Sequence, residues 1–391
     1  LRLRDKNIVT QIDNFMADNS KAPRNSDGSA PPPLFAPFRA RGLTIKNRVV
    51  LSPMCQYSAI DGAPTDWHLV HLGSRAVGGA GLILAEMTNV SPEGRISLGC
   101  AGLWSDSQAN AWQRIVDFVH ANSSAKIGIQ LAHAGRKAST QRPWEGGKSL
   151  SKDEGGWEII GPSAIAFSPA YQTPRAMNDA DLARIKQAFV DAAMRAERSG
   201  FNVIELHMAH GYLLSSFLSP LSNQRSDCYG GSLENRMRYP LEVFEAVRAA
   251  WPKEKPIFVR VSATDWLEPE GQVIEDTVAF ARELKKCGCD VVDVSTAGNV
   301  PESKPVFGRM YQVPFAEAVR FGAEIPVMAV GAIAGADHAN TIIAAGRADL
   351  CAIARGHLSD TAIVNRHAQA EGVDGIDWPK QYLAVKPSRK K

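Results

Sequence analysis

Eight short apolar segments recur along the chain, and each is followed by a segment with helical spacing of apolar residues. Strands that are buried on both faces have this nearly continuous apolar character. The predicted strands cover 49–51, 82–85, 127–131, 201–206, 257–261, 291–294, 326–330 and 350–353. The predicted helices cover 66–77, 106–121, 179–199, 232–250, 275–286, 313–321, 338–345 and 360–369. Regular alternation of strand and helix predicts an α/β fold with a parallel sheet.

Eight such units can close into a TIM (β/α)8 barrel, which needs about 250 core residues and leaves room here for insertions. An open, doubly wound sheet is the alternative. It normally carries a Gly-x-Gly-x-x-Gly turn after a strand, and this chain has none. We therefore predict a single barrel domain at 34–370, with a flexible extension at 1–33, a long loop at 134–177 after the third strand, and a tail at 371–391.

Charge and cysteine content narrow the class of protein. The 391 residues include 44 basic and 41 acidic side chains, which gives a net charge of +3. Without extended blocks of like charge, neither nucleic acid nor a membrane surface is an expected partner, and no apolar run reaches membrane-spanning length. The six cysteines are scattered and suggest no disulfide framework, so we expect a reducing, cytoplasmic location.

Polar and reactive side chains follow most of the predicted strands. In a barrel, the C-terminal ends of all strands meet at one mouth, where the active site lies. The side chains that we expect to converge there are Cys55, Tyr57, Glu86, Gln130, His133, His207, His210, Tyr212, Arg260, Ser295, Gly331 and Arg355. This convergence predicts a catalytic site built from most of the chain.

Two of these strand ends suggest an anion site. Gly331 is followed by small residues with open backbone N–H groups, and Ala354-Arg355-Gly356 follows the last strand. The loops after strands seven and eight of this fold often bind phosphate. An equally open interpretation is that Gly331 only makes a turn and that Arg355 pairs with a surface carboxylate. Gln130 and Arg260 offer donors toward a flat heterocycle.

His207 and His210 have two possible roles. They could be ligands of a metal-dependent hydrolase or lyase, with Glu86 and His133 as further ligands. Neutral histidines could instead donate hydrogen bonds to a carbonyl or nitro oxygen, and Tyr212 could then deliver a proton.

Cys55 admits three interpretations: an inert buried thiol, a side chain that tunes a redox cofactor, or a nucleophile.

Six ordered segments between about residues 34 and 358 resemble the Old Yellow Enzyme family of flavin-dependent ene-reductases, in its cysteine-bearing, xenobiotic-reductase-like and thermophilic-like branch. They are Ser52-Pro-Met-Cys-Gln-Tyr57, Gly128-Ile-Gln-Leu-Ala-His-Ala-Gly-Arg-Lys137, Glu205-Leu-His-Met-Ala-His-Gly-Tyr-Leu213, Phe217-Leu-Ser-Pro-Leu-Ser-Asn223, Tyr229-Gly-Gly-Ser-Leu-Glu-Asn-Arg236 and Phe258-Val-Arg-Val-Ser262.

The resemblance implies a TIM barrel that holds non-covalent FMN and reduces activated C=C bonds with NADPH or NADH. By position, it implies that FMN is lined by Ser52, Pro53, Met54 and Cys55, that its ring is bonded by Gln130 and Arg260, and that its phosphate is bound by Gly331 and Arg355. It also implies that Cys55 tunes the flavin, that His207 and His210 hold the substrate oxygen, that Tyr212 donates the proton, and that Tyr57 contacts the substrate. A homodimer or homotetramer is the expected assembly.

The chain departs from the family pattern in three places. Met87 stands where this branch often has a small alanine beside the flavin, and Ala354 replaces a common glycine before Arg355. Both positions are still expected to contact FMN. The C-terminal segment Gln381-Tyr-Leu-Ala-Val-Lys386 lacks the arginine that some relatives send into a neighbouring active site, so we do not expect a shared site.

Overall fold

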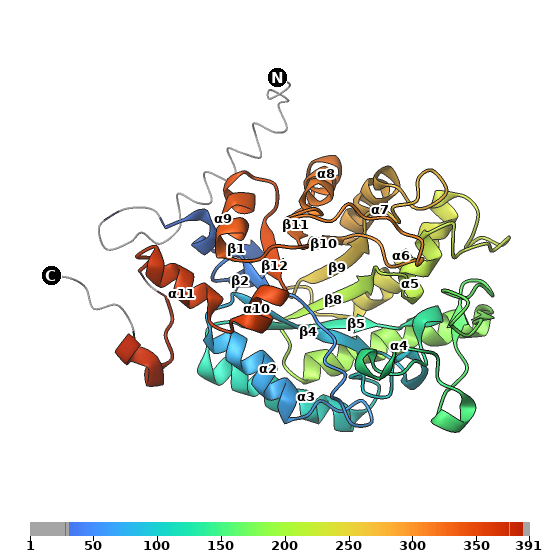
Figure 1. Cartoon of the computed structure of the whole chain (residues 1–391), viewed down its shortest axis with the longest axis horizontal. Coiled ribbons are helices and arrows are strands. Elements are labelled where there is room, and N and C mark those ends of the chain that lie inside the picture. Colours follow the sequence, from blue (N-terminus) through green and yellow to red (C-terminus); the bar gives the residue numbers. More distant parts are fainter. Residues whose placement is uncertain (1–27, 29–30, 375, 386–391) are drawn as a thin grey trace, which may run out of the picture.

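The computed structural model describes residues 28, 31–374 and 376–385. At its centre, eight parallel strands form a closed barrel, as the sequence predicts (Figure 1). The order around the barrel is β10-β11-β12-β3-β4-β5-β8-β9, so strands that are consecutive among these eight along the chain are neighbours. Most of the predicted extension at 1–33, namely residues 1–27, 29 and 30, and part of the predicted tail fall outside the described residues.

Each barrel strand is followed by a helix that covers its outer face. The barrel strands are β3 (Val49–Leu51), β4 (Leu82–Asn89), β5 (Lys126–Ala132), β8 (Val203–Met208), β9 (Ile257–Ser262), β10 (Val291–Ser295), β11 (Val327–Ala329) and β12 (Leu350–Ile353). The outer helices are α2 (Asp66–Val77), α3 (Asp106–Asn122), α4 (Asp179–Arg198), α6 (Leu233–Ala250), α7 (Ile274–Cys287), α8 (Val313–Ala323), α9 (Ala336–Ala344) and α11 (Ile363–Ala370).

Two apolar layers hold these elements together. The first lies inside the barrel and includes Val50, Val203 and Phe258, all fully buried. The second lies between the strands and the helices and includes Trp112 and Phe189. Because alternate side chains of a strand point to opposite faces, a strand with apolar residues on both faces can contribute to both layers. This explains why the barrel strands are apolar almost throughout.

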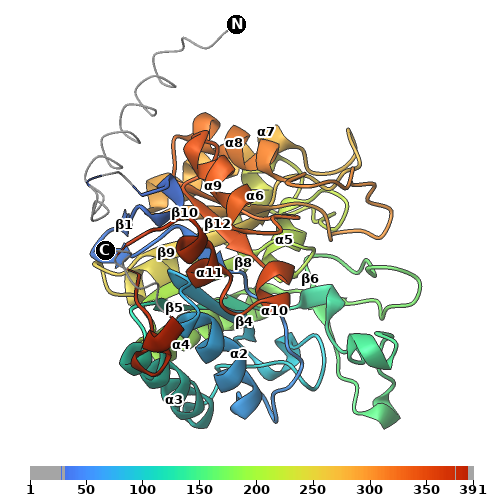
Figure 2. The same ribbon diagram turned by 60° about the vertical axis from the view of Figure 1, so that its left-hand side comes forward.

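Several short elements are absent from the sequence prediction. The antiparallel hairpin of β1 (Phe38–Ala40) and β2 (Leu43–Ile45) packs Phe38 and Ile45 against the interior cluster of the barrel. Helix α5 (Leu213–Leu218) lies within the segment after β8 that was expected to be loop, and α10 (Arg355–Ser359) precedes α11. The long loop at 134–177 projects from the barrel, and its short strands β6 (Ile160–Gly161) and β7 (Arg175–Ala176) pair with each other (Figure 2).

In the described part of the chain, no helix combines the length and apolar character that crossing a bilayer requires.

Candidate active site

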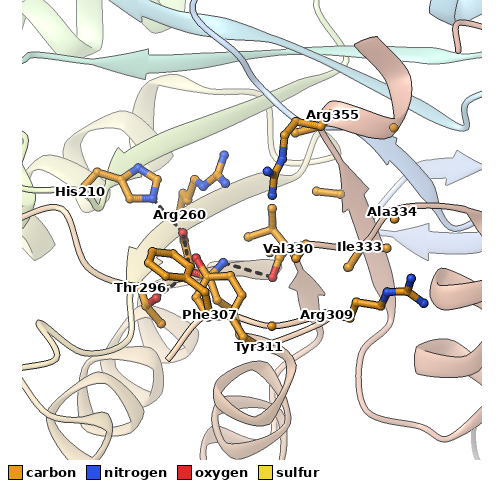
Figure 3. Close-up of a pocket in the computed structure, with 18 of the residues that line it drawn as sticks. His210, Arg260, Thr296, Phe307, Arg309, Tyr311, Val330, Ile333, Ala334 and Arg355 are labelled. Atoms are coloured by element: carbon orange, nitrogen blue, oxygen red, sulfur yellow. Dashed lines mark hydrogen bonds between the residues drawn. The ribbon is translucent and has the colours of Figure 1, made fainter. Parts of the chain in front are cut away.

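A cavity of about 930 Å³ opens at the C-terminal ends of β9 to β12 (Figure 3). Arg260 and His210 line one end, whereas the backbone after β11 and Arg355 line the other. The side chains of Arg260 and Arg355 point into the space between them. Its volume is typical of cofactor sites. The structure thus brings Arg260, His210, Gly331, Ala354 and Arg355 together around one cavity, as predicted from their strand ends.

A buried polar layer lies beneath the Arg260 end of the cavity. The Arg260 Nε atom is 3.3 Å from a carboxylate oxygen of Asp293 on β10. On the neighbouring strands, Gln130 Nε2 donates to Glu205 Oε1 at 2.7 Å. All four side chains are almost completely buried. Since buried polar groups are costly unless they are paired, this layer fixes the positions of Gln130 and Arg260.

The two acids in this layer have different protonation behaviour. Burial and the neighbouring Asp293 raise the pKa of Glu205 to about 8, although Arg260 and Gln130 oppose this shift. Burial raises the pKa of Asp293 to about 6, against the effect of Arg260. Because burial raises the pKa of both acids, the coupled pair of Glu205 and Asp293 keeps a proton more readily than free carboxyl groups and offsets the charge of Arg260. The layer as a whole carries little net charge into the cavity.

His207 and His210 form a hydrogen-bonded chain with a defined direction. The backbone N–H of Ala209 donates to His207 Nδ1 at 3.3 Å, so the proton of a neutral His207 lies on Nε2. That nitrogen is 3.3 Å from His210 Nδ1, and His210 Nε2 is 2.8 Å from Ser295 Oγ. The His207 N–H is therefore donated to His210 Nδ1, and the His210 N–H is donated to Ser295 Oγ.

Both histidines are neutral at physiological pH. Burial lowers the pKa of His207 and of His210 well below its usual value, and the positive charges of Arg260 and Lys137 lower both further. A neutral imidazole can polarise an oxygen without adding a full charge to the site. Neutral imidazoles can also bind metal, but no cluster of three or more His, Cys, Asp or Glu side chains suited to a metal ion occurs among the described residues.

Tyr212 stands next to His207 at the start of α5, with the two rings edge to face and their centroids 4.9 Å apart. Burial raises the pKa of the Tyr212 phenol well above 10, and nearby Cys55 raises it further. The phenol therefore keeps its proton throughout the physiological range. The neutral phenol ring lies beside both histidine rings, with centroids 4.9 Å from His207 and 6.5 Å from His210.

Lys137 ends one of the six segments that carry the family resemblance, but it is not among the predicted site residues. The structure places it beside His210 and Tyr212. Its Nζ atom donates to the backbone carbonyls of His210 and Gly298, both at 2.9 Å, and lies 5.2 Å from the centre of the Tyr212 ring. Burial lowers the pKa of Lys137 to about 8, so the ammonium form still predominates at neutral pH. Lys137 thereby fixes the strained His210 backbone, whose φ is 61°.

The opposite end of the cavity is a cradle of backbone after β11. Gly331 has a φ of 107°, and a Cβ atom there would lie 2.4 Å from Gln312 Nε2. Gln312 is held in turn by Val330 O and Thr296. The amides of the next two residues, Ala332 and Ile333, donate to no described group. Open backbone N–H groups in such a turn suit an anion.

Arg355 completes this cradle from the neighbouring strand end. It directly follows Ala354 and points into the cavity (Figure 3). No described carboxylate pairs with it, so the surface ion pair that the sequence left open is not formed among the described residues. An arginine beside free backbone amides can bind phosphate.

Cys55 lies on the other side of the mouth, after β3. Its side chain packs in one small cluster with Met87 and Tyr212. Burial raises the pKa of the Cys55 thiol well above 9, and Glu86 raises it further. The preceding Ser52 is fixed by its N–H bond to Ile353 O at 3.2 Å.

Not every predicted residue lines the cavity. Ser52, Pro53, Met54, Cys55, Met87 and Gln130 lie at neighbouring strand ends but outside its wall. Tyr57 packs edge to face on Trp144 of the long loop, with ring centroids 5.8 Å apart. His133 is buried and accepts the Gly135 backbone N–H, so it does not join His207 and His210.

Several residues of the site went unpredicted: Glu205, Asp293, Lys137, Thr296, Tyr311 and Gln312. Glu205 and Asp293 carried a usable signal, because an ionisable residue inside an apolar strand must find a partner. Gln312 carried none, since its role depends on how β10 and β11 approach each other.

Comparison with known proteins agrees with this architecture. Residues 33–371 match the family described as NADH:flavin oxidoreductase / NADH oxidase. The chain is 45% identical over 351 residues to an NADPH dehydrogenase of Geobacillus thermodenitrificans, covering 89% of this chain and 97% of the relative. It is 42% identical over 396 residues to an NADH:flavin oxidoreductase of Gibberella zeae, covering 94% and 95% of the two chains.

Among solved structures, morphinone reductase superposes with a TM-score of 0.72 at 27% identity. The match covers 88% of this chain and 91% of that chain. A second structure of that enzyme, in complex with tetrahydroNAD, gives a TM-score of 0.71 at 28% identity, with 88% and 92% covered.

Proposed function

The chain belongs to the NADH:flavin oxidoreductase / NADH oxidase family, and from this we propose that it is an FMN-dependent ene-reductase. It is an Old Yellow Enzyme-like, flavin-dependent NAD(P)H oxidoreductase. The proposal adds the second half of the reaction: hydride taken from NADPH or NADH reduces the activated C=C bond of an α,β-unsaturated carbonyl or nitro compound.

The volume of the cavity and the chemistry of its lining residues suit non-covalent FMN. Its Arg260 end presents buried donors for a flat ring, and its cradle of Gly331, Ala354 and Arg355 suits a phosphate. A Cβ at position 331 would clash with the Gln312 side chain, which lines this cradle. When bound, FMN supplies the hydride chemistry, as the carrier between nicotinamide and alkene. We assign Gln130 and Arg260 to the ring, and Ser52, Pro53, Met54, Cys55 and Met87 to the adjoining wall.

The neutral His207–His210 chain is the observation that carries the proposal. Reduction of an enone builds negative charge on its oxygen, and preorganised neutral donors stabilise that charge. A substrate oxygen takes up both N–H groups by replacing Ser295 Oγ as the acceptor from His210 and His210 Nδ1 as the acceptor from His207. Tyr57 and the long loop at 134–177 shape the rest of the substrate pocket.

Tyr212 is the proposed acid. Its phenol retains the proton at neutral pH and stands beside His207. Proton delivery to the α-carbon leaves a phenolate, which the nearby Lys137 ammonium stabilises. Balanced reduction of the alkene then takes one hydride equivalent from the nicotinamide and one proton from Tyr212, which is reprotonated from solvent.

Nicotinamide and alkene share this mouth in turn, which gives ping-pong kinetics. The complex of morphinone reductase with tetrahydroNAD supports a nicotinamide site in a barrel of this kind. The expected homodimer or homotetramer and the 34–370 domain boundary remain predictions. No observation favours the metal-dependent hydrolase, because His207 and His210 gain no third ligand among the described residues.

Product analysis tests the function. The purified, FMN-loaded protein is incubated without oxygen with NADPH or NADH and with cyclohexenone, N-ethylmaleimide or a nitroalkene. We expect alkene-dependent nicotinamide oxidation and an equal amount of saturated product with at least one of these substrates. Nicotinamide oxidation that requires oxygen, and leaves every alkene unchanged, would contradict the proposal.

A further inference from the structure

The Lys137 ammonium is a cation that pairs with no carboxylate among the described residues. It ends the short 3-10 helix η3 (Gly135–Lys137), which follows β5. Two of its three N–H groups donate to the backbone carbonyls of His210 and Gly298, both at 2.9 Å. Burying a charge is costly unless the surroundings compensate it. Two carbonyls compensate it only in part, so the remaining contacts of the ammonium matter for its charged state.

These remaining contacts are the faces of two aromatic rings. Lys137 Nζ lies over the Phe167 ring, 4.4 Å from its centroid, and over the Tyr212 ring, 5.2 Å from its centroid. The negative face of an aromatic ring attracts a cation, and the attraction is strongest where water is excluded. Phe167 is the nearer ring and has no polar group. The face of the ring is therefore the interaction that it offers to the ammonium.

Phe167 lies in the long loop at 134–177, and its surroundings hold it in place. Arg136 Nη1 donates to the backbone carbonyls of Ile165 and Ala166, at 3.4 and 3.2 Å, directly before Phe167. The Tyr171 ring packs edge to face on the Phe167 ring, with centroids 5.0 Å apart. These contacts place the ring over the ammonium before any ligand binds.

The groups that surround Lys137 leave it as the charge nearest the proposed acid. The titratable groups around it are Arg136, His207, His210 and Tyr212. Both histidines are neutral and Tyr212 keeps its proton at physiological pH, because burial shifts their pKa values in these directions. Burial, and then the positive Arg136, lower the pKa of Lys137 to about 8. Asp265 and Glu302 interact with Arg136. The aromatic faces favour the ammonium of Lys137 and so oppose burial.

We propose that Phe167 is a positioning residue that keeps Lys137 charged and beside Tyr212 during proton transfer. The inference rests on the proposed function, in which the Lys137 ammonium stabilises the phenolate that Tyr212 leaves after protonating the α-carbon. Phe167 acts through Lys137 and takes no part in bond making. The long loop thereby supports the acid of the reaction and also shapes the substrate pocket.

The pH dependence of flavin reoxidation tests this role. The full-length, FMN-loaded protein is reduced with NADPH without oxygen, mixed with cyclohexenone and followed by stopped-flow absorbance. The ammonium is present below its pKa and is lost as pH rises, so the wild-type rate should fall through about pH 8. Phe167→Leu keeps an apolar side chain but removes the ring face. The ammonium is then lost at lower pH, and we expect the fall to move down by about one pH unit.

Two variants serve as controls. Phe167→Tyr keeps the ring face and should retain the wild-type profile. Phe321→Leu removes a ring whose centroid lies 5.4 Å from the Arg320 guanidinium carbon on α8, and it should also leave the profile unchanged. A slower Phe167→Leu without a shift of its pH profile would identify the ring as a structural wall and would overturn the proposal. An equal shift in Phe321→Leu would overturn it as well.

Competitive labelling gives a second readout that needs neither nicotinamide nor alkene. Acetic anhydride reacts with neutral amines, so mass spectrometry of the peptide that contains Lys137 follows its titration in the FMN-loaded protein. We expect a midpoint at about pH 8 in the wild type and about one pH unit lower in Phe167→Leu. Equal midpoints would contradict the proposal.

The wild-type midpoint puts the proposal at risk even if Phe167→Leu does not fold, because a midpoint below about pH 7 would mean that Lys137 is not kept charged. Failure of the proposed function has a different signature. In that case no alkene is reduced, while the labelling midpoints still differ between the wild type and Phe167→Leu.

Discussion

At the scale of single residues, the chemistry depends on where a few protons sit. Backbone N–H groups determine this for both buried histidine sites. The Ala209 N–H orients His207 toward His210, and the Thr65 N–H orients His68 toward Glu86. The fixed tautomers give the His207–His210 pair a defined direction of donation and place His68 Nε2 at 3.0 Å from a Glu86 oxygen. Each arrangement is preorganised before any ligand arrives.

Removal of both proposed oxygen donors should separate binding of FMN from turnover. For His207→Ala with His210→Ala, we expect FMN to remain bound and kcat/KM for an enone to fall by about 10²–10³-fold or more. The cause is loss of stabilisation of the developing oxyanion. Steady-state kinetics and a phenol titration of the flavin spectrum measure the two effects. Unchanged turnover would remove the histidines from the mechanism.

Tyr212→Phe should affect only the step that needs a proton. We expect reduction by NADPH at nearly the wild-type rate, and reoxidation by an enone to slow by about 10²-fold. Stopped-flow absorbance of the flavin resolves the two half-reactions. Equal slowing of both would identify Tyr212 as a structural residue, and no slowing would mean that water is the acid.

The sequence predicted which residues end the strands, and therefore most of the candidate site. It could not predict the hydrogen-bond directions or the irregular pairing of β4 with β5 at Glu86, because both depend on backbone groups of neighbouring strands. Lys137 illustrates the same limit. Its partners are carbonyls of His210 and Gly298, which lie 73 and 161 residues away along the chain.

At the scale of elements, the turn after β11 determines whether a phosphate can enter. Gly331 takes a backbone conformation that other residues adopt at a cost of about 1–3 kcal/mol, and its missing side chain leaves room for Gln312. The same turn leaves the amides of Ala332 and Ile333 open. The backbone conformation of this turn therefore determines whether its N–H groups are open to a phosphate.

Gly331→Ala should weaken FMN binding by about tenfold or more, because strain at this φ and the clash with Gln312 reshape the cradle. Fluorescence titration of the flavin-depleted protein with FMN measures the affinity. Gly335→Ala is a matched control, since Gly335 has an extended φ of −159° and no atom near the added Cβ. An equal loss in both variants would contradict this role of Gly331.

The sequence predicted those helices and strands whose apolar pattern is long enough to establish a period. Helix α2 has the predicted bounds, and α6 begins next to its capping Ser232. The hairpin of β1 and β2 and helix α5 span only three to six residues each, which is too short to establish a period. The hairpin is positioned by packing against the interior cluster of the barrel, and α5 is positioned by following directly after Tyr212 at the mouth.

At the scale of the whole molecule, closure of the barrel buries groups that would titrate freely in an unfolded chain. Burial lowers the pKa values of five histidines, to about 4 for His71 and His133 and below the usual value for His207, His210 and His357. Burial raises the pKa values of three acids: Glu205, Asp265 and Asp293.

These shifts predict an acid-sensitive fold. As pH falls through about 6.5, the unfolded chain protonates the five histidines and the folded chain does not. The three acids act in the opposite sense, because the folded chain binds their protons first. The histidines outnumber the acids, so the unfolded chain takes up more protons than the folded chain as pH falls. Each additional proton bound favours the unfolded state by roughly 1.4 kcal/mol per pH unit. Tm should therefore fall between pH 7 and pH 5 at constant ionic strength, whereas an unchanged or higher Tm at pH 5 would contradict this balance.

The central claim is that one barrel mouth takes hydride from a nicotinamide and gives it to an activated alkene. A sequential experiment without oxygen tests it most directly. The FMN-loaded protein is first bleached with one equivalent of NADPH, and cyclohexenone or N-ethylmaleimide is then added. We predict rapid return of the oxidised flavin spectrum and one equivalent of saturated product. A flavin that stays bleached with every alkene, and recovers only when oxygen is admitted, would contradict the claim.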